Sequence, residues 1–75
     1  MERQRFIVDA KEGNWCVIRE GRPNPIGRFP TKRQAISRAR QVARSHGHSQ
    51  LIVKTKEHVI QAEWTYGEDP QRISG

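Results

Sequence analysis

The chain has 75 residues, of which 33% are hydrophobic, and its 14 Lys and Arg residues outnumber its 8 Asp and Glu residues. A chain of this length forms one domain with one thin core, so we expect a single domain over residues 1–75 without a deep substrate pocket. The formal net charge of +6 favours phosphate backbones or acidic proteins as partners, although a solvated basic surface also keeps a small protein soluble.

The cysteine content and the start of the chain bear on its location. The single cysteine rules out an internal disulfide, whereas small domains of oxidising compartments usually carry several. The first residues are charged, and no apolar stretch reaches the length of a signal peptide or a membrane span. We therefore expect a cytoplasmic protein that does not associate with a membrane.

The first predicted elements are two strands that pair as an antiparallel hairpin. Residues 5–10 alternate in character, with Phe6, Val8 and Ala10 on one face. Residues 15–19 form the second strand, which is apolar on both faces at its start and polar at its end. The four residues between the strands include a glycine and form the turn.

A loop and then a helix follow the hairpin. Residues 21–30 hold three prolines and two glycines, so the sequence predicts a loop without regular structure. Thr31, followed three residues later by Gln34, matches a capping box and predicts the start of a helix. An apolar stripe rich in alanine continues to about His46, and Gly47 predicts the helix end. The small alanine side chains allow the helix to lie close to a sheet.

Two more strands are predicted after the helix, at residues 50–56 and 59–66, and the first of them has one face that is more polar and exposed to solvent. Residues 67–75 contain turn-forming residues and almost no apolar ones, which predicts an irregular tail. The expected fold is α+β with the order ββαββ, in which one helix packs on one face of a short antiparallel sheet. The strand order within the sheet stays open, because a helix between two hairpins permits several arrangements.

Three groups of residues carry a resemblance that spans nearly the whole chain. They are Asn14-Trp15-Cys16-Val17, Phe29-x-Thr31-Lys32-x-x-Ala35-Ile36-x-x-Ala39 and Tyr66-Gly67-x-Asp69-Pro70-x-Arg72-x-x-Gly75. This set resembles the small bacterial family called domain of unknown function 2188. The resemblance implies an α+β fold with one helix across a short antiparallel sheet, and no established activity. The family tends to have an Asp-Gly turn where this chain has Lys56-Glu57-His58, which leaves the length and register of the last hairpin open.

The predicted helix is the main candidate for a binding element, because it contains five basic residues and no acidic one. At about 100° per residue, Arg33, Arg40 and Arg44 form a ridge beside the apolar stripe together with Ser37, and Arg38 lies alone on the other flank. Phosphate contact requires only cationic donors at suitable spacing, which this ridge provides. The alternative is that the arginine stems only cover the flanks of the helix against water.

We predict a non-catalytic nucleic-acid-binding protein, in which the helix arginines hold phosphates and basic residues of the loop and the third strand extend the surface. DNA and RNA are not distinguished, because no base-reading motif is present. The alternative is a protein-interaction module whose basic face docks an acidic partner or whose exposed sheet edge pairs with another chain. A homodimer could also bury the second face of the sheet, with the candidate residues Ile7, Cys16, Ile18 and Ile52. The predicted nucleic-acid-binding residues are Arg33, Arg40, Arg44, Arg22, Arg28, Lys54 and Lys56.

The aromatic residues have two interpretations. Trp15 and Trp64 would stack on the bases of a single-stranded nucleic acid if they were exposed. A domain this small needs its tryptophans for burial, so core packing is the preferred interpretation. Tyr66 is the aromatic residue that we expect nearer the surface.

The sequence predicts no catalytic, cofactor or metal site. Cys16 lies in mid-strand, where buried cysteines are usually inert. The loop glycines lack the Lys-Ser or Lys-Thr that follows a phosphate-binding loop. We therefore expect no enzyme activity, no cofactor and no small-molecule substrate. The residues considered as metal ligands are His46, His48, His58 and Cys16, whose spacing matches no recognised site, so solvated histidines are preferred.

Overall fold

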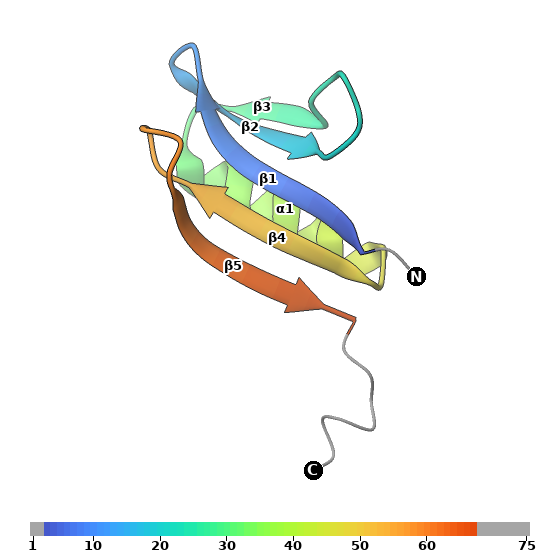
Figure 1. The fold of residues 1–75 in the computed structure, drawn as a ribbon. Coiled ribbons are helices and arrows are strands. Elements are labelled where there is room, and N and C mark those ends of the chain that lie inside the picture. Colours follow the sequence, from blue (N-terminus) through green and yellow to red (C-terminus); the bar gives the residue numbers. More distant parts are fainter. Residues whose placement is uncertain (1–2, 68–75) are drawn as a thin grey trace.

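The computed structural model describes residues 3–67, which form one helix and a five-stranded sheet of order β3-β2-β1-β4-β5 (Figure 1). The predicted α+β class is confirmed, and the observed order is β-β-β-α-β-β. Beyond Gly67, the predicted irregular tail lies outside the described residues. The elements are β1 (Gln4–Lys11), β2 (Asn14–Arg19), β3 (Gly27–Phe29), α1 (Lys32–Ser45), β4 (Ser49–Lys54) and β5 (Ile60–Tyr66).

Strand β3 corrects the prediction that residues 21–30 form only a loop. It pairs antiparallel with β2, where Phe29 lies opposite Trp15 and Arg28 lies opposite Cys16. Three residues are too few for an alternating pattern to be visible in the sequence, and the prolines on either side suggest irregular structure. An edge strand bonds to a neighbour on one side only, so a short strand between prolines is tolerated there.

The sheet is mixed, whereas the sequence predicts an antiparallel one. Strand β1 pairs antiparallel with β2 but parallel with β4, so that Phe6 lies beside Leu51 and Val8 beside Val53. The direction follows from the connections. Strands β1 and β3 both run antiparallel to β2, and the helix after β3 returns the chain to begin β4 in the direction of β3. Strand β4 must therefore run parallel to β1.

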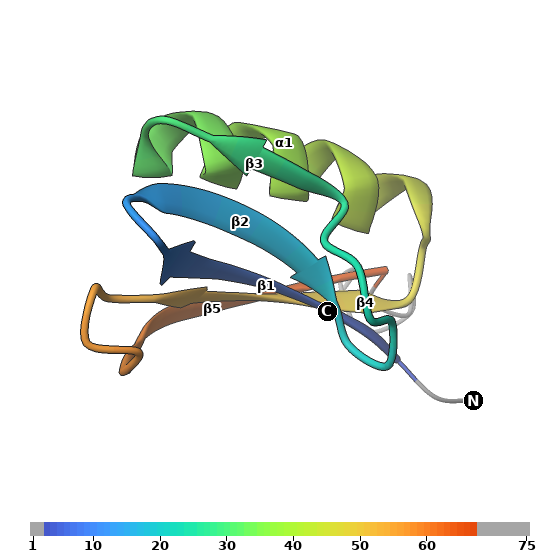
Figure 2. The same cartoon turned by 90° about the horizontal axis from the view of Figure 1, so that it is seen from above.

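The core lies between α1 and the face of the sheet that the helix covers (Figure 2). Alternation along the strands directs large apolar side chains toward the helix, and the helix packs small side chains against them. This arrangement confirms the predicted apolar face of β1 and the alanine-rich stripe of the helix. The buried residues of this cluster are Phe6, Val8, Val17, Leu51 and Val53 from the sheet and Ala35, Ala39 and Ala43 from α1.

The opposite face of the sheet is covered in part by the chain itself. Cys16 and Ile52 are only 1% and 6% exposed, and Ile7 and Ile18 are half-buried. The loop between β2 and β3 lies against this face, where Pro23 and Pro25 line a small cavity of about 60 Å³ together with Lys11, Cys16 and Ile18. This face therefore depends less on a second copy for burial than the sequence suggested.

The two helix ends are set by the residues that the sequence indicates. The Thr31 side-chain oxygen accepts a hydrogen bond from the backbone N–H of Gln34 at 3.2 Å. The second half of a capping box is absent from this pair, since the Gln34 side chain accepts a hydrogen bond from the Thr31 hydroxyl instead. At the other end, Gly47 adopts φ +74° and its N–H bonds to the Arg44 carbonyl. Glycine tolerates this left-handed conformation without steric cost.

The substitution Thr31→Ala should destabilise the domain by about 1 kcal/mol, because it removes the only side-chain acceptor at the helix start among the described residues. The free energy of unfolding in urea measures the loss. Thr31→Ser keeps the hydroxyl and serves as the control. An equal loss in both variants would show that the hydroxyl does not carry the effect.

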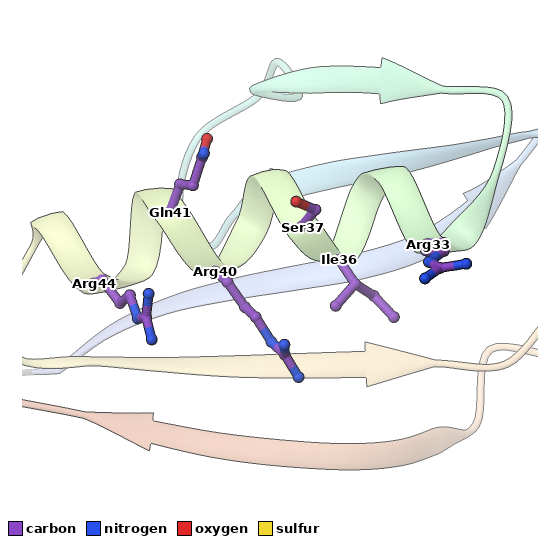
Figure 3. A pocket seen from close by; sticks show the side chains of 6 residues that line it. All are labelled: Arg33, Ile36, Ser37, Arg40, Gln41 and Arg44. Carbon is purple, nitrogen blue, oxygen red and sulfur yellow. The ribbon is translucent and has the colours of Figure 1, made fainter.

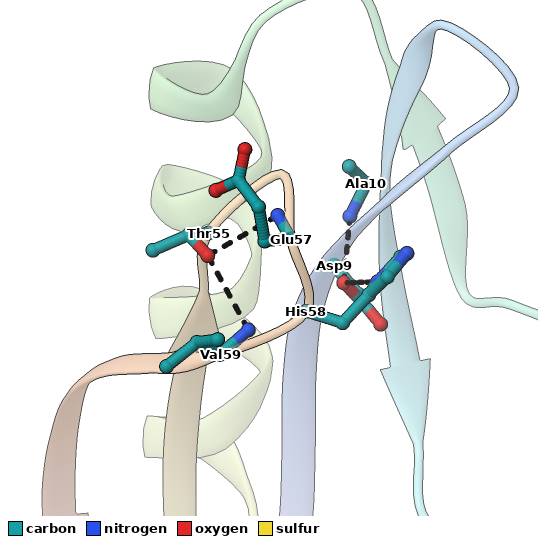
Figure 4. Close-up of polar contacts among 6 residues, drawn as sticks. All are labelled: Asp9, Ala10, Thr55, Glu57, His58 and Val59. Carbon is teal, nitrogen blue, oxygen red and sulfur yellow. Dashed lines mark hydrogen bonds and ion pairs between the residues drawn. The ribbon is translucent and has the colours of Figure 1, made fainter.

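The turn between β4 and β5 is built from side-chain contacts (Figure 4). The Thr55 side-chain oxygen accepts hydrogen bonds from the backbone N–H groups of Glu57 and Val59, at 3.2 and 3.3 Å. His58 has φ +68°, a conformation that favours glycine, and its Nδ1 lies 2.8 Å from Oδ1 of Asp9. The contact with Asp9 ties this turn to β1 and helps to hold His58 in a conformation that is otherwise costly.

In the part of the chain between residues 3 and 67, no helix has the length and the apolar character required to span a lipid bilayer.

Candidate nucleic-acid interface

Three of the predicted arginines lie together on one flank of α1. Arg33, Arg40 and Arg44 are exposed and lie on the side of the helix that faces β4 and β5 (Figure 3). They span about 16 Å along the helix axis, because each residue adds about 1.5 Å. Together with Ile36, Ser37 and Gln41 they line a shallow groove of about 450 Å³, which we call the arginine groove.

Arg40 extends from the helix across the sheet to β5. Its guanidinium carbon lies 5.1 Å from the ring centroid of Trp64, within the range of a cation–π contact. Trp64 pairs with the core residue Leu51, so its side chain points to the helix side of the sheet. The contact holds Arg40 above the outer strand, where its charge stays accessible to solvent.

The tryptophans pack against the core, as the preferred interpretation predicts, but neither is fully buried. Trp15 lies under the Lys32 ammonium, whose nitrogen is 5.1 Å from the ring centroid, and Lys32 also donates a hydrogen bond to the Gln61 side chain. Tyr66 is half-buried in the same way as the tryptophans. Each tryptophan is therefore partly covered by a basic residue of the helix.

The charges of the arginine groove have no acidic partner among residues 3–67. Within that range, the two ion pairs join Arg5 to Glu20 at 3.5 Å and His58 to Asp9 at 2.8 Å, and both are remote from α1. The helix itself contains no Asp or Glu. Three positive charges on one flank without local neutralisation create a positive potential that attracts polyanions.

Two of the other predicted residues point away from the arginine groove. Arg28 on β3 neighbours Phe29, and Lys54 on β4 neighbours Val53, and both neighbours pack on the helix side of the sheet. Successive side chains of a strand point to opposite faces. Arg28 and Lys54 therefore belong to the face opposite the helix, so the prediction that they extend the helix surface is not met by the fold.

The remaining two predicted residues lie at opposite ends of the sheet. Lys56 is in the turn after β4 and lines a depression with Trp15 and His58. Arg22 is in the loop after β2, beside Arg19. Neither lines the arginine groove, so the structure groups three of the seven predicted residues and separates the other four.

Sequence reasoning did not identify the contribution of Trp64, Ile36 and Gln41 to this site. Ile36 belongs to the apolar stripe and Gln41 follows Arg40, so both are recoverable from helical periodicity alone. The contact of Trp64 with Arg40 has no local signal, because it depends on β5 lying beside β4.

The histidines are dispersed. The ring centroids of His46 and Phe6 lie 5.2 Å apart, and His58 contacts Asp9. In the described part of the chain, no group of three or more His, Cys, Asp or Glu side chains is placed to hold a metal ion.

Comparison with known proteins places the chain in a family. A family model described as an uncharacterized protein conserved in bacteria, domain of unknown function 2188 (DUF2188), matches residues 5–66. The chain belongs to this family. The match to DUF2188 spans the helix, the three inner strands and both edge strands, and so includes the arginine groove. No curated protein and no solved structure shows a significant match.

Proposed function

We propose that this DUF2188 protein is a non-catalytic nucleic-acid-binding protein that holds phosphates along the flank of α1. The observation that carries the proposal is the arginine groove, where Arg33, Arg40 and Arg44 line one surface without an acidic partner among residues 3–67. Guanidinium groups suit this role because they stay charged at all physiological pH values and can donate two hydrogen bonds to one phosphate.

The spacing of the arginines fits a phosphate backbone. Arg40 and Arg44 are one helical turn apart, and Arg33 lies about two turns before Arg40. One strand of B-DNA presents a phosphate every 3.4 Å or so along the duplex axis, so arginines spread over roughly 16 Å can each meet a different phosphate. A protein partner would call for a buried apolar anchor at the centre of the surface. The groove offers only Ile36 in that role, which favours a polyanion.

Binding through phosphates has a measurable signature. Each neutralised phosphate releases counterions, so three arginine contacts give a slope of log K against log salt of about −2.7 for duplex DNA and about −2.1 for single strands. We expect little dependence on base sequence, because none of the described residues that line the groove forms a base-reading motif.

The double variant R40E/R44E tests the proposal. We expect it to bind labelled duplex DNA, single-stranded DNA and RNA at least tenfold more weakly than the wild type, a loss of about 1.4 kcal/mol or more. Fluorescence anisotropy across a salt series measures the affinity, and circular dichroism checks that the variant is folded.

The matched control is R28E/R38E. Each Arg→Glu replacement lowers the net charge by two, so both double variants go from +6 to +2. Arg28 lies on the opposite face of the sheet, and Arg38 bonds to Gln41 from the other flank of the helix. We expect R28E/R38E to bind within about twofold to threefold of the wild type, a difference well below 1.4 kcal/mol. Equal losses in the two variants would mean that net charge alone governs binding, and unchanged affinity in R40E/R44E would refute the groove.

A further inference from the structure

The two edges of the sheet differ in how well they resist pairing with another chain. Strand β3 has three residues and lies between Pro25 and Pro30, and both features discourage edge pairing. Strand β5 has seven residues and no proline, and it pairs with β4 on one side only. Among residues 3–67, no segment pairs with its outer side (Figure 1).

Strand β5 also differs from the other strands in charge. Each of the strands β1 to β4 contains Lys or Arg, whereas β5 contains neither and carries one charge, that of Glu63. Two copies of a protein with net charge +6 repel each other, and β5 adds no basic side chain of its own to that repulsion. The basic side chains that contact β5, Lys32 at Gln61 and Arg40 at Trp64, come from the helix. Val59, which precedes β5, and Ile60, its first residue, are 60% and 51% exposed. Because β5 also lacks the Lys and Pro residues that protect edge strands from pairing, its outer edge is suited to a second copy.

We propose that two copies of the chain pair antiparallel through β5, which joins two five-stranded sheets into one of ten strands. The two-fold axis of such a pair is perpendicular to the sheet, so both helices lie on the same face. This inference rests on the proposed function, because it makes the arginine groove of one copy into half of a larger cleft. The other half is the arginine groove of the second copy.

The sequence of β5 favours a register centred on Trp64 over one centred on Glu63. A pair centred on Trp64 places Glu63 opposite Thr65 of the second copy and Ala62 opposite its Tyr66. A pair centred on Glu63 would instead place two carboxylates directly opposite each other, which is unfavourable. In the Trp64-centred register the two tryptophans meet at the axis, and each lies under an Arg40. Aromatic cross-strand pairs of this kind are favourable.

The resulting cleft has a floor formed by two copies of β5 and walls formed by two copies of α1. Arg33, Arg40 and Arg44 of both copies face into it, because all three lie on the side of the helix toward β5 (Figure 3). A polyanion between the helices then meets up to six arginines. The expected salt slope for duplex DNA rises in magnitude from about −2.7 to about −5.4.

A pair of edge variants tests the interface. Residues 63 and 65 are both exposed, and a lysine at position 63 removes only the exposed hydrogen bond that Glu63 accepts from the Gln50 side chain, so the isolated fold stays intact. In the Trp64-centred register, position 63 of each copy faces position 65 of the other. The variant E63K/T65K therefore places two lysines opposite each other at both of these positions, whereas T65K places its new lysine opposite Glu63. Sedimentation equilibrium without nucleic acid should show a mass of twice 8.7 kDa for the wild type and for T65K. The double variant E63K/T65K should dimerise at least tenfold more weakly.

The outcomes separate this inference from the proposed function. A wild type that stays monomeric at high concentration, or an E63K/T65K variant that dimerises as strongly as T65K, overturns the pairing through β5. The variant R40E/R44E should remain dimeric while it loses nucleic-acid binding. If the dimer behaves as expected but no nucleic acid binds, the pairing stands and the proposed function fails. A salt slope near −2.7 in place of −5.4 for the dimer would show that the two grooves do not act on one ligand.

Discussion

The substitution Phe6→Ala will lower the free energy of unfolding by about 3–5 kcal/mol. Phe6 is the largest fully buried side chain in the described part of the chain, and it lies in the strand at the centre of the sheet. Its removal loses the transfer free energy of the ring and leaves a cavity that the surrounding strands cannot fill. The total stability of a domain of this size is about 4–11 kcal/mol, so the variant will be marginally folded.

Urea denaturation followed by tryptophan fluorescence measures this loss. The control is Ile60→Ala, which removes an apolar side chain from a strand at a position that is half-exposed. We expect the control to lose less than about 1 kcal/mol, because the burial of Ile60 is small. A loss in Phe6→Ala no larger than in the control would contradict the position of Phe6 in the core.

The second large effect is expected for Ala39→Leu. Ala39 is fully buried at the middle of α1, where the helix meets the sheet. Leucine has nearly the helix propensity of alanine, so the cost arises from packing and not from the backbone. Overfilling a well-packed core costs about 1–3 kcal/mol, and here it also displaces the helix that carries the arginine groove.

Gln41→Leu is the matched control for Ala39→Leu, because it introduces the same side chain two residues further along, on the exposed surface of the helix. We expect a change within about 0.5 kcal/mol for this control. Both free energies of unfolding come from the same urea titration. If Ala39→Leu were as stable as Gln41→Leu, the close approach of helix and sheet would be in doubt.

The features that the sequence predicted correctly are those with local signals. Thr31 and Gly47 mark the helix ends through groups within one turn of each end. The hairpin of β1 and β2 follows from alternation and a turn, in which Glu12 and Gly13 both have positive φ, as tight hairpins require. In both cases the physical cause lies within a few residues of the pattern.

The features that the sequence did not predict depend on residues far apart in the chain. The short β3 forms because Phe29 packs beside Trp15, and the parallel pairing joins β1 to a strand that begins after the helix. No periodicity within either segment specifies its neighbour.

The candidate site divides in the same way. The ridge of Arg33, Arg40 and Arg44 follows from the helical repeat and was predicted as a group. The separation of Arg28 and Lys54 from this ridge follows from the face to which each strand residue points, and therefore from the strand order. That order was undetermined before the fold was known.

The burial of Cys16 has a practical consequence. It is the only cysteine, it is 1% exposed, and its strand has neighbours on both sides. A thiol-specific reagent reaches it only when the loop of Pro23 and Pro25 moves away or the sheet opens, so the labelling rate in native buffer reports the free energy of that opening. The same reaction applied to each surface variant separates a loss of binding from a loss of folding. A variant that labels as slowly as the wild type has kept the sheet closed.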